Sequence, residues 1–181
     1  MSIENIQKSN FKSPLSRGSI LNAALTIADS DGLQALSMRK IAGKLGVKAM
    51  SLYNHVENKE DIIDGIVDLV VQEIELPNIQ EPWKNAMRKR ANSAYKVLLA
   101  HPWAPIPLVS RENTGPAMLA YIDATIGSLV EAGFSYQTAD HAWNAIDSHI
   151  FGFTLQELHF PLEVKEYSKA AESFLAGLAV D

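Results

Sequence analysis

Residues 48–55 carry side chains of the types that contact the edges of DNA bases. Leu52 and Val56 recur at helical spacing and should face inward, so the other side chains of this segment should face outward. The outward set is small or polar and contains no acid, which suits a DNA major groove about 12 Å wide. With flanking positions included, the candidate DNA-contacting residues are Ser37, Arg39, Lys48, Ala49, Met50, Ser51, Tyr53, Asn54, His55 and Lys59.

Tyr53 and Lys59 are suited to bind phosphate groups, through a phenolic hydroxyl and an ammonium group. Backbone N–H groups at helix N-termini would add further donors to phosphates. Such contacts would fix the register of the protein on the duplex, while side chains at base edges would supply sequence preference. The alternative for Tyr53 and His55 is that both side chains only pack against neighbouring helices.

The elements that position these residues are predicted by caps and turns. Ser37 is suited to cap a short helix over 38–45, and Gly46 can adopt the positive φ that ends it. A tight turn then leads into a helix over 48–55, and this spacing is that of a helix-turn-helix. A helix over 17–31 precedes the pair, and Asn58 is suited to cap a further helix that runs to about residue 74.

Residues 35–59 resemble the DNA-binding signature of the TetR family. The matching residues are Ser37, Ile41-Ala42, Leu45-Gly46-Val47, Leu52-Tyr53, His55 and Asn58-Lys59. The resemblance implies that Ser37, Tyr53 and Lys59 touch phosphates. It places at or near base edges Lys48, Ala49, Met50, Ser51 and Asn54. It also implies a homodimer that reads a palindromic operator, with repression as the usual activity and release by a small-molecule inducer.

The rest of the chain continues the helical spacing of apolar residues. We therefore expect an all-α fold, with a helix-turn-helix DNA-binding domain over residues 1–60. Residues 61–181 should form a helical effector-binding and dimerisation domain, with helix 61–75 as a connector. Its further helices are expected over 82–100, 115–132, 135–159 and 165–179. The last two are suited to pair with their copies in a two-fold four-helix bundle, which predicts a homodimer through the C-terminal helices.

Three details of the second domain can be predicted. Residues 101–107 contain three prolines and should form a kinked connector, because proline removes a donor and restricts the residue before it. The basic residues expected to form a solvated helix face are Lys84, Arg88, Lys89 and Arg90. The residues of helix 115–132 expected to face inward are Met118, Leu119, Ile122, Ile126, Leu129 and Val130.

Aromatic side chains and a few polar groups in the second domain predict a pocket for a mostly apolar small molecule. The candidate ligand-binding residues are His101, Trp103, Arg111, Trp143, Asp147, Phe151 and Glu157. This part of the chain is similar to tetracycline repressors, in which a Glu near the end of the long helix assists binding of magnesium–tetracycline, and Glu157 would match it. The magnesium-binding His of those proteins has no counterpart within residues 104–114. We therefore expect a different effector, and predict no metal and no cofactor.

Composition limits the classes of function. The chain has 181 residues, no cysteine and a net charge of −5, which excludes disulfides and thiolate chemistry. The first 60 residues hold eight Lys or Arg and five Asp or Glu, a net charge of +3, so the remainder carries −8. A basic N-terminal part fits contact with a polyanion at one end of the protein. The polar N-terminus and the lack of an apolar run of about 18 residues predict a cytoplasmic protein without a membrane span.

Two other classes of function stay open from the sequence. His, Asp and Glu side chains on the 135–159 helix could form an acid–base site of an enzyme. However, the sequence has no nucleophile elbow, no glycine-rich phosphate loop and no metal-binding pair at helical spacing. A helical protein-interaction module is the other alternative. It would leave the basic recognition helix unexplained, and binding to duplex DNA that does not respond to salt would favour it.

Overall fold

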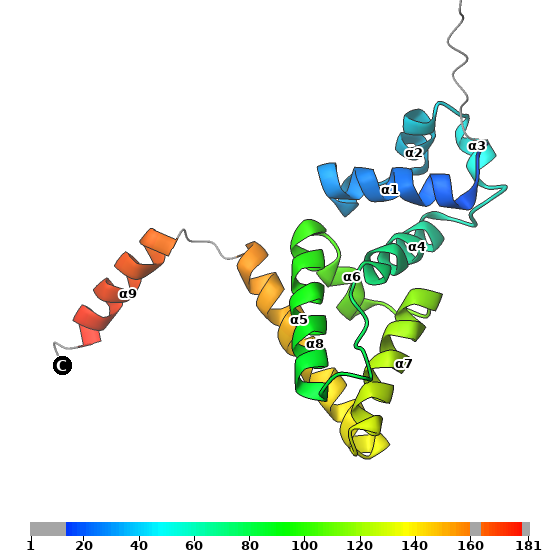
Figure 1. The fold of residues 1–181 in the computed structure, drawn as a ribbon. Helices are drawn as coiled ribbons and strands as arrows, with labels where there is room; N and C mark the ends of the chain where they lie inside the picture. The colour runs from blue at the N-terminus through cyan, green and yellow to red at the C-terminus, as the bar shows by residue number, and fades with distance from the viewer. Residues whose placement is uncertain (1–13, 160–163, 179–181) are drawn as a thin grey trace, which may run out of the picture. The chain divides into compact units, whose positions relative to one another are not determined.

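The computed structural model describes residues 14–159 and 164–178, and within these ranges all the regular structure is helical. The predicted all-α fold is therefore confirmed. The elements are α1 (Arg17–Asp31), a 3₁₀ turn (Leu33–Ala35), α2 (Met38–Leu45), α3 (Ala49–Leu52), α4 (Lys59–Gln72), α5 (Trp83–Ala100), α6 (Pro105–Ser110), α7 (Pro116–Glu131), α8 (Tyr136–His159) and α9 (Val164–Leu178) (Figure 1). The predicted end of the last helix, residue 179, lies outside the described residues.

The contacts divide the chain into two compact units, with the division between Ile66 and Val67 inside α4. We call the N-terminal part unit 1 and the C-terminal part unit 2, and each is described by itself. None of the helices in the described part of the chain is long and apolar enough to cross a membrane.

Unit 1 is built around the buried face of α1. Ser16 and Ser19 form a reciprocal capping box at the start of this helix, and Gly32 follows its end with a φ of 80°. The α1 side chains that face the core include Ile20, which is fully buried with Ile41 of α2 and Leu52 of α3. A Cβ atom added to Gly65 of α4 would lie 2.6 Å from a methyl group of Leu21. This glycine therefore allows the close packing of α4 on α1.

The two helices of the predicted helix-turn-helix are positioned by local bonds. The Ser37 hydroxyl accepts a hydrogen bond from the Lys40 N–H at 3.2 Å, and Gly46 adopts the left-handed conformation (φ 67°, ψ 36°) that ends α2. The helix predicted over 48–55 is shorter in the structure, because α3 ends at Leu52. The N–H of His55 bonds to the carbonyl of Leu52, three residues earlier, which is the spacing of a tight turn rather than of an α-helix.

Unit 2 is a layered packing of α5, α6 and α7 against the long helix α8, with α5 also contacting α7. One cluster of its core is formed by Ala86, Met87, Leu129 and Ala139. Trp83 of α5 covers this cluster and meets the Phe134 ring edge-on, with 5.0 Å between the ring centroids.

Two expectations about unit 2 are wrong. Residues 101–107 were expected to form a kinked connector, but their last three residues are the first turn of the helix α6, which includes Pro105 and Pro107. First-turn N–H groups have no partner within a helix, so proline is tolerated there. Leu119 was expected to face inward but is 55% exposed. Met118 and Leu129 are buried as predicted, and they share the buried face of α7 with the polar residues Tyr121 and Thr125.

Candidate functional site

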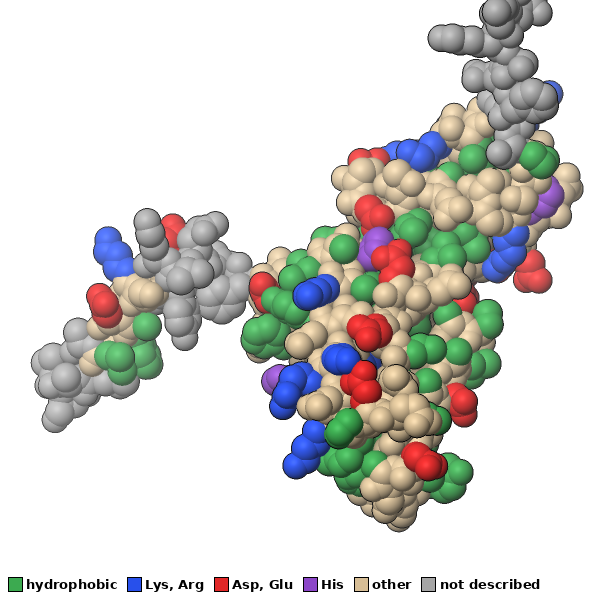
Figure 2. All heavy atoms as spheres, in the orientation of Figure 1, with side chains coloured by type: hydrophobic (Ala, Val, Ile, Leu, Met, Phe, Trp, Pro, Cys, Tyr) green, Lys and Arg blue, Asp and Glu red, His purple; other side chains and the backbone are tan. Residues whose placement is uncertain are grey.

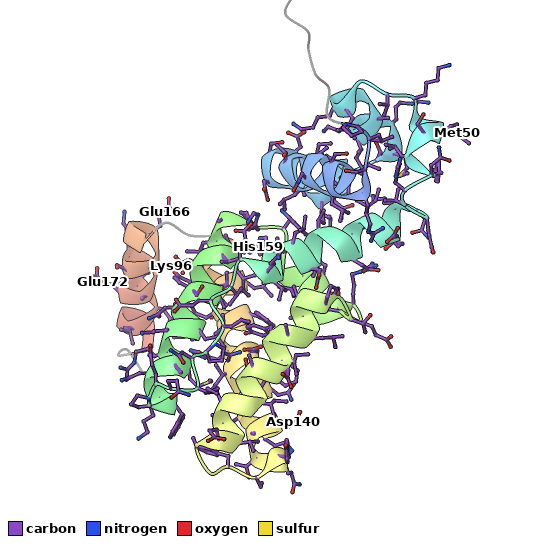
Figure 3. The ribbon with its side chains drawn as sticks, turned by 45° about the vertical axis from the view of Figure 1, so that its right-hand side comes forward. Met50, Lys96, Asp140, His159, Glu166 and Glu172 are labelled. Atoms are coloured by element: carbon purple, nitrogen blue, oxygen red, sulfur yellow. The ribbon has the colours of Figure 1, made fainter. Side chains whose placement is uncertain are left out.

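The outward face of the α2–α3 region carries the predicted DNA-contacting side chains. Leu52 and Val56 are buried as predicted, whereas Met50 is 75% and Tyr53 47% exposed. The other exposed members of the set are Ser37, Arg39, Lys48, Asn54 and His55, while Ala49, Ser51 and Lys59 are half-buried. In Figure 3, Met50 projects from the outer edge of this region, away from α1. The exposure of Tyr53 and His55 argues against the alternative that these side chains only pack against neighbouring helices.

A charged clamp that the sequence analysis missed holds the turn after α3. Arg17 of α1 donates two hydrogen bonds to the carboxylate of Asp61 of α4, at 2.8 and 2.6 Å. The same carboxylate accepts the Glu57 N–H at 2.9 Å, and the Asn58 side chain caps α4 by accepting the Asp61 N–H. The bond from Arg17 holds the pKa of Asp61 below its usual value. A surface groove beside the clamp is lined by Arg17, Tyr53, Asn54, His55, Val56, Glu57 and Asp61.

Unit 2 contains a cavity of about 510 Å³, within the size range of small-molecule sites. Three of the predicted ligand-binding residues line it, namely Trp143, Asp147 and Phe151 of α8. The other lining residues are Leu108, Val109, Asn113, Met118, Ile122, Asn144, Ser148, Gly152 and Leu155. The wall is therefore mostly apolar, with one carboxylate and a few neutral polar groups.

Arg90 was expected on a solvated helix face, and this prediction is wrong. Its side chain is 0% exposed, and its Nη1 lies 2.8 Å from Oδ1 of Asp147. The same nitrogen donates to the Tyr121 hydroxyl at 2.6 Å, and Thr125 lies at the limit of bonding distance. The sequence does hold a signal for this placement, because Ala86, Arg90 and Ala94 recur at four-residue spacing along the buried face of α5.

The Asp147 carboxylate is the centre of this buried polar cluster. It accepts hydrogen bonds from the Tyr121 hydroxyl, at 3.0 and 3.1 Å to its two oxygens, and from the Trp143 indole N–H at 2.7 Å. Burial raises the pKa of Asp147, and the adjacent Arg90 guanidinium opposes this effect. Burial also raises the pKa of Tyr121. Because the Arg and Trp groups can only donate, the geometry fits an ionised Asp147 that accepts from all its partners.

The remaining predicted ligand residues do not line this cavity: His101, Trp103, Arg111 and Glu157. His101 is buried, with Nε2 3.3 Å from a carboxylate oxygen of Glu73. Glu157 is exposed and accepts a hydrogen bond from the Tyr95 hydroxyl, which joins α5 to α8. Among the described residues, no group of three or more His, Asp or Glu side chains is arranged to hold a metal ion.

The start of α7 is bonded to α4 through Asp68, another contact that the sequence analysis missed. The Asp68 carboxylate accepts the backbone N–H groups of Ala117 at 3.2 Å and Met118 at 3.0 Å, so it caps α7 from a different helix. Gly115 makes this approach possible, because a Cβ atom there would collide with the Asp68 carboxylate. Met118 therefore bonds to α4 through its backbone N–H and also lines the cavity.

Comparison with known protein families gives two matches. Residues 76–178, more than half of the chain, match the family described as "Tetracyclin repressor-like, C-terminal domain". Residues 20–66 match "Bacterial regulatory proteins, tetR family". The second match contains the whole of α2 and α3, and the first contains the cavity and its lining helices.

Individual relatives agree with these matches. The chain is 35% identical over 147 residues to an "HTH-type transcriptional regulator" from Saccharopolyspora erythraea, covering 81% of this chain and 62% of that protein. It is 29% identical over 150 residues to the "HTH-type transcriptional repressor DrrR1" from Streptomyces coeruleorubidus, covering 82% and 56%. The chain thus spans less than two thirds of these relatives. The structure is similar to Streptomyces coelicolor ActR in complex with actinorhodin (TM-score 0.79, 27% identity, 88% of this chain and 76% of that chain).

Proposed function

Because the chain belongs to the tetR family of bacterial regulatory proteins, we propose that it is a ligand-responsive transcriptional repressor. In this proposal a homodimer binds a palindromic operator and leaves it when a small-molecule inducer binds to unit 2. The observation that carries the proposal is the α3 face, which is exposed, free of acids and held by a capped α2 and a left-handed Gly46. A rigid face of this kind can enter the major groove and present its side chains to base edges.

Dimerisation is proposed to use α8 and α9. Phe153 of α8 and Phe174 and Leu175 of α9 are large apolar side chains that are more than half exposed. Hydrophobic side chains gather on one side of α9 (Figure 2). Exposed apolar surface on two helices is suited to a two-fold four-helix bundle with a second copy of the chain. Two copies would place a pair of recognition helices about one turn of DNA apart, roughly 34 Å, as a palindromic operator requires.

The cavity in unit 2 is proposed as the inducer site. It combines aromatic and aliphatic walls with a few fixed polar groups, which is the usual composition of small-molecule sites. ActR, to which the structure is similar, has been crystallised with actinorhodin. By analogy, this chain is expected to bind a small organic molecule in the corresponding unit.

The route by which an inducer would act on DNA binding is proposed to run through Asp68. A ligand that contacts Met118 can change the position of the first turn of α7, whose N–H groups are bonded to Asp68 of α4. Because α4 carries residues of both units, a shift of α7 would favour a different position of α4. The inducer would then lower operator affinity by as much as it prefers the conformer that does not bind DNA.

The acid–base enzyme considered from the sequence is not favoured. The relatives named above are transcriptional regulators. Within α8, the His149 ring stacks on Phe153, with 6.2 Å between the ring centroids, and Glu157 is bonded to Tyr95. These side chains are thus engaged with neighbours rather than gathered around a shared site.

The proposal is tested by measuring the affinity of the purified protein for its own promoter-region DNA and for random duplex across a series of salt concentrations. We expect tighter binding to promoter DNA as a dimer, with an affinity that falls steeply as salt is raised. Replacement of Tyr53 by Ala should weaken binding about tenfold through loss of a bond to a phosphate. Tyr136→Ala is the matched control, because Tyr136 is also exposed (74%) but lies at the start of α8. Equal affinity for both DNAs, together with no effect of Tyr53→Ala, would refute the proposal.

A further inference from the structure

We propose that the effector is an uncharged aromatic molecule with a hydrogen-bonding group such as a hydroxyl. The inference rests on the proposed function of the unit 2 cavity as the inducer site. Among the described residues that line this cavity, Asp147 alone carries a charge. The Arg90 guanidinium behind it balances this charge before any ligand enters, while the carboxylate stays the charged group nearest to the cavity, so the site selects against both cations and anions.

The electrostatic argument starts from the partners of Asp147. One oxygen has the Arg90 guanidinium at 2.8 Å and the Tyr121 hydroxyl at 3.0 Å, and the other has the Trp143 indole N–H at 2.7 Å. A carboxylate offers about four lone pairs, so three donor groups leave it with little further capacity. A cationic ligand would have to compete with a guanidinium that is already in place. It would lose its own hydration without gaining a free counter-ion.

Anions are disfavoured by the position of the positive charge. Arg90 is fully buried and does not line the cavity, so an incoming anion meets the Asp147 carboxylate and not the guanidinium. Like charges at short distance repel, and the low-dielectric wall of the cavity strengthens this repulsion. The pair of charges therefore makes the wall polar without giving it a net charge.

The shape of the cavity favours an aromatic ligand. Trp143 and Phe151 both line it, and the indole is held by its N–H bond to Asp147, one helical turn further along α8. A ring fixed in this way loses little rotamer freedom when a flat ligand packs against it. Exposed polar side chains of the same cavity, Asn144 and Ser148, can bond a ligand hydroxyl. The amide nitrogen of Asn144 donates to Asp140, which leaves its oxygen as the acceptor that it offers.

The test uses isothermal titration calorimetry at pH 7 with the full chain and three probes that share one naphthalene ring. These are 2-naphthylmethanol (uncharged), 2-naphthoate (an anion) and 2-naphthylmethylammonium (a cation). We expect the alcohol to bind about tenfold or more tightly than either ion, because each ion gives up hydration without a partner. Equal or tighter binding of either ion would overturn the proposal, as would failure of all three probes to bind at millimolar concentration.

A single substitution at Asp147 should change the preferred probe from the uncharged one to the anion. In Asp147→Asn the Arg90 guanidinium loses its counter-ion and stays charged, so 2-naphthoate should become the tightest of the three probes. Asp123→Asn, at an exposed position on α7, is the matched control and should keep the order of probe affinities that the wild-type protein shows. A folded Asp147→Asn protein that still prefers the alcohol would overturn the electrostatic argument. If circular dichroism shows that this variant is unfolded, the order of the three probe affinities on the wild-type protein decides whether the proposal stands.

The outcome can be separated from that of the proposed function. Promoter binding is measured without any probe, so the regulator proposal can fail while the order of probe affinities holds. Conversely, a protein that binds promoter DNA specifically but prefers a charged probe would refute the inference about the ligand alone.

Discussion

Replacing Asp147 by leucine should destabilise unit 2 more than replacing Asp147 and Arg90 together. The single change leaves a guanidinium that is 0% exposed without a counter-ion, and breaking a buried ion pair in this way costs about 3–5 kcal/mol. Arg90→Met should cost less, because Asp147 keeps its bonds from Tyr121 and Trp143, and because its raised pKa favours the neutral form when the guanidinium is absent.

The double variant removes both charges of the buried pair. It leaves the Tyr121 hydroxyl and the Trp143 N–H without their acceptor, at a cost of about 1–3 kcal/mol for each group, and Asp147→Leu alone has the same cost. The sum of the two single effects should therefore exceed the effect of the double variant by at least about 2 kcal/mol. This difference is the coupling free energy of the pair.

The assay is urea unfolding followed by circular dichroism, with the free energy of unfolding and its denaturant dependence fitted for all four proteins. A matched control cycle uses the exposed pair of Lys89 and Glu81, which lie 2.7 Å apart at the surface. This control pair should show no measurable coupling, because water and salt screen exposed charges. If the effects of Asp147→Leu and Arg90→Met were additive in the double variant, the buried pair would not interact as the structure indicates, and the reasoning would be refuted.

Three further predictions concern helix caps and charge. Asp68→Ala should lower the melting temperature of unit 2 through loss of a cap worth about 1 kcal/mol, whereas Asp123→Ala on the exposed face of α7 should not. Gly115→Ala should destabilise the wild-type protein, and in thermal unfolding it should cost less in the Asp68→Gly background, where the side chain that the new Cβ atom would meet is absent. The pKa of Asp61 is lowered in the folded protein, so its bonds to Arg17 stabilise the fold fully above about pH 4, the pKa in the unfolded chain. This stabilisation is lost as the pH falls through the lower, folded pKa. Denaturation should therefore show a difference between wild type and Asp61→Asn that is large at pH 6 and small at pH 3.

Features that depend on near neighbours in the chain could be predicted from the sequence. Ser37 and Gly46 set the limits of α2 through bonds within a few residues of each position. Apolar spacing likewise predicted α1, α7 and α8 to within about one residue of each end. Boundaries were wrong where polar residues gave no periodic signal, as at the end of α3, or where proline occupied a first helical turn, as in α6.

The candidate ligand site was harder to predict, because long-range packing decides which side chains share a cavity. Trp143, Asp147 and Phe151 were predicted from residue type alone, and they share the cavity because they lie at four-residue spacing on one face of α8. His101 and Glu157 looked equally suitable by residue type, but their partners, Glu73 and Tyr95, lie on other segments and hold them elsewhere. The spacing of Ala86, Arg90 and Ala94 indicates that Arg90 faces the core, but its partner carboxylate is supplied by α8, and no local pattern in α5 identifies that partner.

The positions of the tryptophans give the protein a built-in optical reporter. The chain has three tryptophans: Trp83 packs edge-on against Phe134, Trp103 lies beside the His101 ring, and Trp143 lines the cavity. The Trp143 indole is bonded to a carboxylate and borders the space that a ligand would fill, so its emission should change when a molecule enters. With Trp83 and Trp103 replaced by Phe, the fluorescence of the remaining indole would follow occupancy of the cavity directly, in free protein and on DNA alike.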